Sequence, residues 1–303
     1  MIPYETNNFN HMKRTCLQET QIPVKISDVS SIRPLKTNYL RMKITVLTEN
    51  LAGGHFLAEH GLSFLIEHDN KTILFDTGQS DVFLSNARKL GIDLQKKVDQ
   101  LILSHGHWDH GDGLQFIKNK PLLTHPAAFM KRFRKNDSTS IGLKMSLEEI
   151  KNKFQLTSSA KPVHLSNDII FLGEIPRTNV FESQTTPFVD EDGAEDYIPD
   201  DSALAIIHDE KLIIISGCAH SGICNICEYA KRITGIKTIQ AVIGGFHLKH
   251  QNEQTKRTIQ YFKNEKVEQL IPSHCTELPA LSAFYSTFKT HQLKTGQILE
   301  FSK

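Results

Sequence analysis

The fold of this chain is decided by the stretch Leu101-Ile-Leu-Ser-His105-Gly-His107-Trp-Asp109-His110. The aliphatic residues predict a buried strand, and three histidines and an aspartate follow within six positions. Imidazole and carboxylate groups together suit Zn²⁺, Fe²⁺ or Mn²⁺. Four ligands so close in sequence can hardly all reach one ion. The pattern therefore predicts two neighbouring metal ions, with His105 and His107 on one and Asp109 and His110 on the other.

Three later apolar runs also end in side chains that can bind metal. They are Leu212-Ile-Ile-Ile-Ser216-Gly-Cys218-Ala-His220, Ala241-Val-Ile-Gly-Gly-Phe-His247 and Gln269-Leu-Ile-Pro-Ser-His274. Functional side chains collect on loops whose positions a rigid scaffold fixes. Helix-like segments at 222–233 and 252–264 separate these runs, so the pattern predicts an α/β protein with one shared site.

Composition excludes several classes of function. The 303 residues are 39% hydrophobic and 23% charged, with a net charge of +1. This near-neutral balance argues against binding to nucleic acid or to an anionic membrane. No apolar run approaches the roughly 20 residues that a membrane span needs. Residues 1–20 lack the apolar core of a signal peptide, so we expect a cytoplasmic protein. The five cysteines, an odd number, are expected to be free thiols and not a disulfide framework.

The His-x-His-x-Asp-His motif resembles the metallo-β-lactamase superfamily. Two further phrases agree with it: Phe75-Asp76-Thr77-Gly78 precedes the motif, and Ser273-His274-Cys275 follows a late strand. The resemblance runs from about residue 42 to residue 303. It implies an αββα sandwich of two βα halves, with the metal site at the shared sheet edge.

The domain organisation follows from the same resemblance. Residues 42–303 form the metallo-β-lactamase-like domain, and residues 1–41 form an irregular extension or reflect a start codon chosen too early. The stretch 126–165 differs in character and predicts a helical insertion over or beside the site. Within it, Ser146 and Glu149 have the spacing of a capping box.

The resemblance assigns one further ligand: His274 matches the superfamily's late histidine, and we expect it to join Asp109 and His110. In many members the third ligand beside His105 and His107 is an earlier histidine, which has no counterpart at a strand end here, so we expect His220 to take that place. Cys218 is a further candidate ligand or a buried free thiol. His247 could bind metal, contact the substrate, transfer a proton or be a structural histidine.

Other residues are expected to support the site. Asp76 would orient the ligand loop through hydrogen bonds. Arg177 and the basic cluster at 131–135 would neutralise an anionic substrate, or simply be surface charge. Glu59 and His60 would stand at the mouth of the site or cap a hairpin. Cys224 and Cys227 have redox-motif spacing, but on a helix they more often face a core.

One branch of the superfamily is more closely similar. The segments 48–50, 59–64, 173–177, 216–220 and 244–248 resemble the 7,8-dihydropterin-6-methyl-4-(β-D-ribofuranosyl)-aminobenzene 5′-phosphate synthase-like proteins, although Glu277 stands where these commonly carry glycine. Many members of this branch are known only as metal-dependent hydrolases.

The predicted function is metal-dependent hydrolysis. Two divalent ions, Zn²⁺ first and Mn²⁺ or Fe²⁺ as alternatives, would activate a hydroxide for attack on a small phosphoester, lactone or related ester. Asp109 and His247 are the candidate catalytic residues. A pterin-related synthase and a non-catalytic metal or ligand sensor are the alternatives. The expected partner is a small anionic molecule, and a homodimer stays open.

Overall fold

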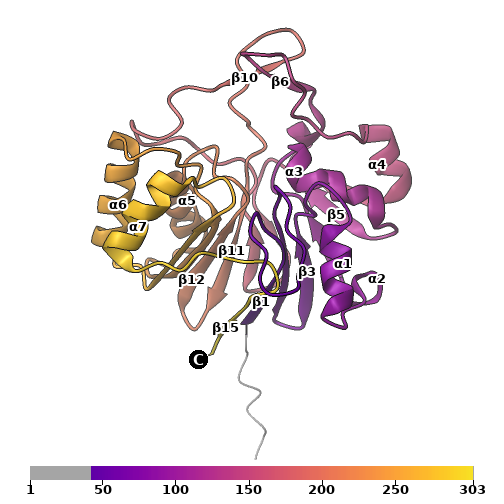
Figure 1. Ribbon diagram of the computed structural model, residues 1–303, viewed down its shortest axis with the longest axis horizontal. Coiled ribbons are helices and arrows are strands. Elements are labelled where there is room, and N and C mark those ends of the chain that lie inside the picture. The colour runs from indigo at the N-terminus through magenta and orange to yellow at the C-terminus, as the bar shows by residue number, and fades with distance from the viewer. Residues whose placement is uncertain (1–41, 303) are drawn as a thin grey trace, which may run out of the picture. The chain divides into compact units, whose positions relative to one another are not determined.

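Two mixed β-sheets lie face to face in the part of the chain that the computed structural model describes, residues 42–302 (Figure 1). The first sheet has seven strands and the second has six. In spatial order, the first contains β15 (Ile298–Phe301), β1 (Met42–Thr48), β2 (Ser63–His68), β3 (Lys71–Phe75), β4 (Gln100–Ile102), β5 (Pro121–Thr124) and β7 (Gln155–Ser158). The second contains β14 (Gln269–Ser273), β13 (Ile239–Gly245), β12 (Lys211–Ser216), β11 (Ala203–His208), β9 (Ile169–Phe171) and β8 (Val163–His164).

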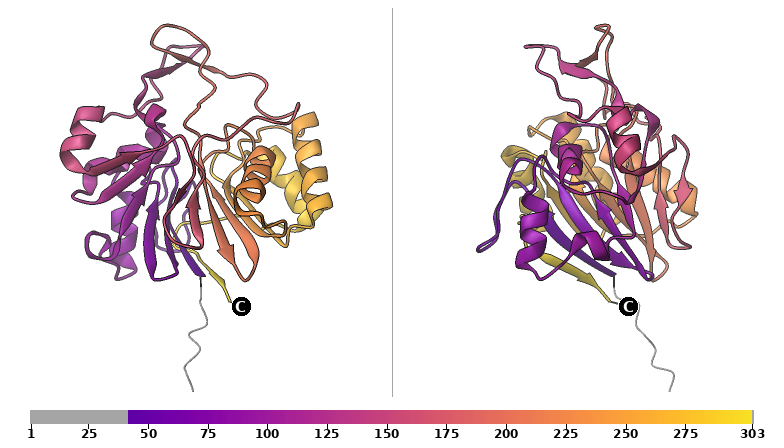
Figure 2. Two further views of the ribbon diagram at one scale, coloured as in Figure 1. Left: turned by 180° about the vertical axis from the view of Figure 1, so that it is seen from behind. Right: turned by 90° about the vertical axis from the view of Figure 1, so that its right-hand side faces the viewer.

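Helices cover the outer face of each sheet, as the views from behind and from the side show (Figure 2). The first sheet carries α1 (Val82–Lys89), α2 (Leu94–Lys97), α3 (Trp108–Gly111), α4 (Leu147–Lys153) and the 3₁₀ turns η1 (Asp112–Phe116) and η2 (Pro126–Phe129). The second carries α5 (Ile223–Thr234), α6 (Glu253–Glu265) and α7 (Leu278–Phe288). The predicted αββα sandwich is confirmed.

The strands are apolar on both faces because both faces are covered. In β2, Phe64 and Ile66 pack into the core between the sheets, whereas Leu65 packs under the helices of the first half. Successive side chains of a strand point to opposite faces. A strand buried on both sides therefore reads as a continuous apolar run, which is what the sequence shows before each histidine-bearing loop.

Local signals in the sequence place several elements. Asp69 and Asn70 turn β2 into β3 with φ values of 50° and 56°, the left-handed conformation that two-residue hairpins require. Ser146 and Glu149 form the expected capping box at the start of α4. The helices expected at 222–233 and 252–264 correspond to α5 and α6.

The stretch 126–165 differs from the predicted helical insertion. Its only α-helix is α4. After it, β7 adds a parallel strand to the edge of the first sheet, and β8 at the end of the stretch belongs to the second sheet. Before α4, β6 (Arg132–Arg134) pairs antiparallel with β10 (Phe188–Asp190). This two-stranded ribbon projects from the end of the sandwich at the top of Figure 1. None of the helices within residues 42–302 combines the length and apolar composition that crossing a membrane requires.

Candidate metal centre

The first group of candidate ligands comes from the loop after β4 and the loop after β12. His105 Nε2 lies 3.1 Å from His107 Nδ1, and both side chains are buried. The ligand nitrogens of His105, His107 and His220 lie within 4.8 Å of one another. Burial lowers the pKa of His107 to about 3 and also lowers the pKa values of His105 and His220. All three imidazoles are therefore neutral at pH 7, as metal binding requires.

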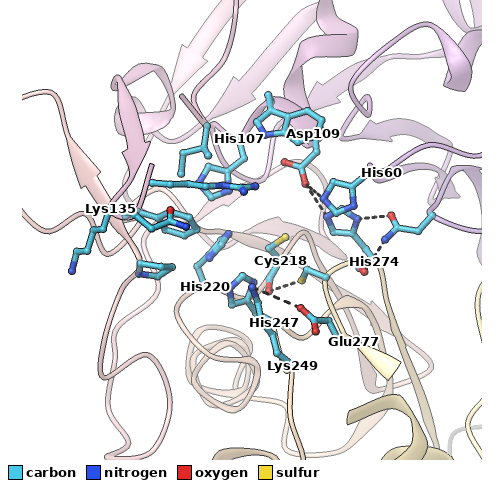
Figure 3. A pocket seen from close by; sticks show the side chains of 18 residues that line it. His60, His107, Asp109, Lys135, Cys218, His220, His247, Lys249, His274 and Glu277 are labelled. Atoms are coloured by element: carbon cyan, nitrogen blue, oxygen red, sulfur yellow. Dashed lines mark hydrogen bonds and ion pairs between the residues drawn. The ribbon is translucent and has the colours of Figure 1, made fainter. Parts of the chain in front are cut away.

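The second group joins the same loop to the end of β14. His110 Nε2 lies 3.0 Å from His274 Nε2, and Asp109 Oδ2 lies 3.3 Å from that same His274 nitrogen. His274 Nδ1 faces the Asn50 amide oxygen at 3.1 Å, which leaves Nε2 directed at Asp109 and His110. Figure 3 shows Asp109 and His274 facing each other across one side of the site.

Cys218 stands between the two groups. Its Sγ is 3.1 Å from His110 Nε2. Its sulfur also lies within 4.8 Å of ligand atoms of His105 on one side and of His220 and His247 on the other. The thiol is thus placed where it could bind metal, and it is buried as the alternative interpretation expected.

The donor set fits divalent cations. His105 Nε2 and His107 Nδ1 lie 3.1 Å apart, and two lone pairs at this distance repel each other unless a proton or a cation lies between them. His220 Nε2 is buried and has no hydrogen-bond partner among the described residues. Imidazole, carboxylate and thiolate are the ligands that Zn²⁺ and Fe²⁺ accept.

Asp76 holds the ligand loop as predicted from the Asp-Thr-Gly phrase. Its Oδ1 accepts a hydrogen bond from the Ser104 backbone N–H at 2.7 Å, and its Oδ2 lies 2.7 Å from both Ser104 Oγ and His110 Nδ1. The proton of His110 is therefore on Nδ1, and Nε2 faces Cys218 and His274. Burial alone would lower the pKa of His110, but Asp76 and Asp109 outweigh burial and raise that pKa to about 9.

Three more buried carboxylates hold ligand loops by accepting backbone N–H groups. Glu49 accepts from His274 at 2.8 Å, Asp200 from Gly106 at 2.6 Å, and Asp201 from Ser221 at 2.9 Å. Sequence reasoning missed all three. Glu49 lies in the 48–50 segment that resembles the synthase-like branch, but no motif indicates its contact, and Asp200 and Asp201 stand in no motif. Each of the three meets its partner only through the tertiary fold.

Main-chain conformation is unusual at four strand ends around the site. Asp76, Ala219, His247 and His274 have φ values between 51° and 56°. Non-glycine residues seldom adopt this left-handed conformation, and it clusters at functional sites. Gly106 is required for another reason: a Cβ there would lie 1.7 Å from the Ala128 carbonyl oxygen.

The predicted basic cluster divides into different environments. Arg132 is fully buried and pairs with Asp196 at 2.9 Å and Asp200 at 2.8 Å, so it joins the ribbon to the ligand loop. Lys131 forms an exposed ion pair with Glu191. Arg134 and Lys135 line the cavity beside the candidate ligands.

This cavity has a volume of about 590 Å³. His247 lines it, and its Nδ1 is buried without a partner among the described residues. Arg177 does not line it, and its guanidinium donates to the Tyr197 carbonyl instead. Its lining residues are Asn50, His60, His107, Trp108, Asp109, Arg134, Lys135, Asn136, Ile141, Pro187, Phe188, Cys218, His220, His247, Lys249, His274, Cys275 and Glu277.

The structure separates the roles left open for Glu59 and His60. Glu59 accepts hydrogen bonds from the backbone of Gln79 and Ser80 and so holds a turn. His60 stands at the cavity mouth, with its side chain 53% exposed and Nε2 3.2 Å from Asp109 Oδ2. The Cys224 and Cys227 thiols are buried in the core under α5, as the packing interpretation expected.

Comparison with known proteins identifies the family of this fold. The family model described as the metallo-beta-lactamase superfamily matches residues 58–124, which include the His-x-His-x-Asp-His motif. A Methanocaldococcus jannaschii protein named 7,8-dihydropterin-6-methyl-4-(beta-D-ribofuranosyl)-aminobenzene-5'-phosphate synthase is 34% identical over 287 residues, covering 86% of this chain and 97% of that protein. The uncharacterized protein MJ0448 of the same organism is 36% identical over 248 residues, covering 79% of this chain and 92% of that protein.

Solved structures of the same superfamily are also similar to this chain. Tm1679, described as a metal-dependent hydrolase of the β-lactamase superfamily, has a TM-score of 0.77 and 30% identity over 86% of this chain and 100% of its own. YhfI from Bacillus subtilis, a metallo-β-lactamase fold protein, has a TM-score of 0.52 and 16% identity over 86% of this chain and all of its own, a likeness of fold alone. The chain therefore belongs to the metallo-β-lactamase superfamily.

Proposed function

We propose that the protein is a metal-dependent hydrolase of small anionic esters, with a phosphoester as the first candidate. One observation carries this proposal: two groups of candidate ligands, drawn from both halves of the chain, meet at a cavity whose wall also carries Arg134, Lys135 and Lys249. Lys135 is paired with Glu195 at 2.6 Å and Lys249 lies 3.9 Å from Glu277, so Arg134 is the cation most available to an anionic substrate.

Two divalent ions held by the His105–His107–His220 and Asp109–His110–His274 groups would supply Lewis-acid polarisation and activation of the nucleophile. Asp109 would orient the attacking water molecule. The basic residues would bind the anionic part of the substrate. His247, whose Nδ1 lacks a partner among the described residues, would contact the substrate beside the reacting bond. Trp108 and Phe188 line the cavity.

A second candidate is a bond-forming reaction on a phosphorylated substrate. It is favoured by 34% identity to the Methanocaldococcus jannaschii synthase across 97% of that protein. The same basic residues would hold a phosphate in either reaction. The two candidates differ in whether water or a second organic molecule accepts the transferred group.

Elemental analysis of protein purified without added metal tests the site first. We expect about two equivalents of Zn, Mn or Fe, and His274→Ala should lose at least one. His164→Ala is the matched control, because His164 is an exposed histidine on β8 that does not line the cavity. One equivalent or none, unchanged in His274→Ala, would exclude the dinuclear site.

A substrate screen then tests the reaction. We expect turnover of phosphodiesters, phosphomonoesters or lactones, and a loss of at least about 100-fold in kcat/KM for His107→Ala. Full metal content without hydrolysis of any ester would favour the synthase or a sensor.

A further inference from the structure

A second, smaller cavity adjoins the one at the metal centre. Its volume is about 160 Å³. The two cavities share four lining residues, Pro187, Phe188, His220 and His247. These four residues therefore form the boundary between two chambers, and Figure 3 shows His220 and His247 lying side by side there, across the larger chamber from Asp109.

The two chambers differ in charge. The larger is lined by Arg134, Lys135 and Lys249 as well as by carboxylates. Among the described residues that line the smaller chamber, none is an aspartate, glutamate, lysine or arginine. Its polar groups other than histidine are hydroxyls and amides, from Ser183, Gln184, Thr185, Thr186, Tyr197 and Gln254. An ion has no partner there, whereas an uncharged group with hydrogen-bonding atoms does.

The size of the smaller chamber fits one ring. A protein cavity of about 150 Å³ holds a benzene molecule, and the smaller chamber has about 160 Å³. Phe181, Phe188 and Ile198 supply apolar surface for the ring faces. The hydroxyls of Ser183, Thr186 and Tyr197 already donate to other protein groups, so each can offer the edge of a ring only an acceptor oxygen.

The boundary coincides with unsatisfied polar atoms. His220 Nε2 and His247 Nδ1 are both buried and both lack a hydrogen-bond partner among the described residues. Buried nitrogens of this kind are normally paired. The metal ion proposed for the His105–His107–His220 group would bind His220 Nε2, which leaves His247 Nδ1 for a group of the substrate. The reacting bond of a substrate that fills both chambers would lie at this boundary.

We propose that the substrate is an ester between an anionic acid, held in the larger chamber, and an alcohol with a single uncharged ring, held in the smaller one. This inference rests on the proposed hydrolase function and specifies its substrate class. For a phosphoester, the bond between phosphorus and the ring alcohol's oxygen breaks. Water supplies the new oxygen on phosphorus and the proton that the alcohol gains.

Binding of phosphonates to the zinc-loaded full chain tests the proposal without requiring turnover, because their carbon–phosphorus bond does not hydrolyse. We expect phenylphosphonate to bind at least about 10-fold more tightly than methylphosphonate, since the ring is buried in the smaller chamber. The charged 4-carboxyphenylphosphonate should lose that advantage. Isothermal titration calorimetry measures all three dissociation constants.

Gln254→Trp tests the location. Gln254 lies in the first turn of α6 and lines only the smaller chamber, so a tryptophan there would fill it. The phenyl-to-methyl preference should fall to near one, while methylphosphonate binds as in the wild type. Gln260→Trp is the control, on the same helix and lining neither chamber. Thr185→Phe repeats the test from the opposing loop if Gln254→Trp does not fold.

Equal binding of phenyl- and methylphosphonate by the wild type, or a preference unchanged in Gln254→Trp, would overturn the proposal. These outcomes are separate from those for the reaction. A ring preference without ester hydrolysis would keep the chamber's assignment as a ring subsite and reject the hydrolase. Hydrolysis without a ring preference would keep the hydrolase and reject the assignment of the smaller chamber as a ring subsite.

Discussion

Asp76 shows how one carboxylate outside the candidate ligand set can control the metal centre. It accepts the Ser104 backbone N–H and fixes the proton of His110 on Nδ1. We expect Asp76→Asn to weaken zinc binding about 10- to 100-fold, because the amide cannot accept all three hydrogen bonds. Chelator competition measures the affinity. Asp81→Asn, which removes a carboxylate that caps no backbone N–H of α1, should leave it unchanged.

His110 makes metal binding depend on pH. Its pKa is raised to about 9 in the metal-free protein, so a proton must leave before metal binds at pH 7. Zinc affinity should therefore rise about tenfold per pH unit from pH 7 to about 9 and then level off. A slope of two would show that the Cys218 thiol, whose pKa burial raises, also loses its proton. Affinity that is constant over this range would contradict the prediction.

For single residues, the sequence allowed prediction of those in recognisable motifs but not of those whose hydrogen-bond partners are distant in sequence. His105 to His110, His220 and His274 follow apolar runs, and the structure brings them together. Glu49, Asp200 and Asp201 carry no such mark. Glu49, for instance, accepts the N–H of His274 across 225 positions of sequence, and only the packed sheets bring the two together. The structure leaves Arg177 outside the cavity.

Among the elements, the β6–β10 ribbon is tied to the ligand loop by a buried ion pair. Burial alone would raise the pKa of Asp200, but Arg132 outweighs it and lowers the pKa. Asp200→Asn leaves Arg132 undercompensated in the interior. We expect the free energy of unfolding to fall by about 3 kcal/mol in urea denaturation, and zinc binding to weaken because Asp200 also accepts the Gly106 N–H.

Glu191→Gln is the matched control for that substitution. Its partner Lys131 is 73% exposed, so the change should cost less than about 0.5 kcal/mol. Equal stability of the two variants would show that the buried pair contributes nothing beyond a surface pair.

Elements with local signals were predictable, and those without them were not. The β2–β3 hairpin and the α4 capping box follow from adjacent residues. The β6–β10 ribbon could not be predicted from adjacent residues, because Arg132–Arg134 pairs with a strand more than 50 positions away. Its basic residues also lack the alternation of apolar and polar side chains that indicates a strand. The position of β15 beside β1 is equally non-local.

At the scale of the whole molecule, residues 42–302 contain both complete sheets and every candidate ligand. We therefore expect a chain that begins at Met42 to fold and to bind the same number of metal ions as the longer chain. Circular dichroism and elemental analysis test this. A shortened chain that is unfolded or lacks metal would show that residues 1–41 contribute to the domain. The predicted extension falls on residues outside those that the structure describes.

The candidate metal site is completed late in the synthesis of the chain. Synthesis proceeds from the N-terminus, and the His105–His110 loop is made long before His220 and His274. The first sheet is complete only when β15, which is made later still, pairs with β1. During translation, the histidines of the His105–His110 loop therefore lack the remaining ligands of both groups at first. The His105–His107–His220 group is complete once residue 220 has left the ribosome, and the Asp109–His110–His274 group only after residue 274 has left it, so the two proposed ions can be fully ligated only in that order.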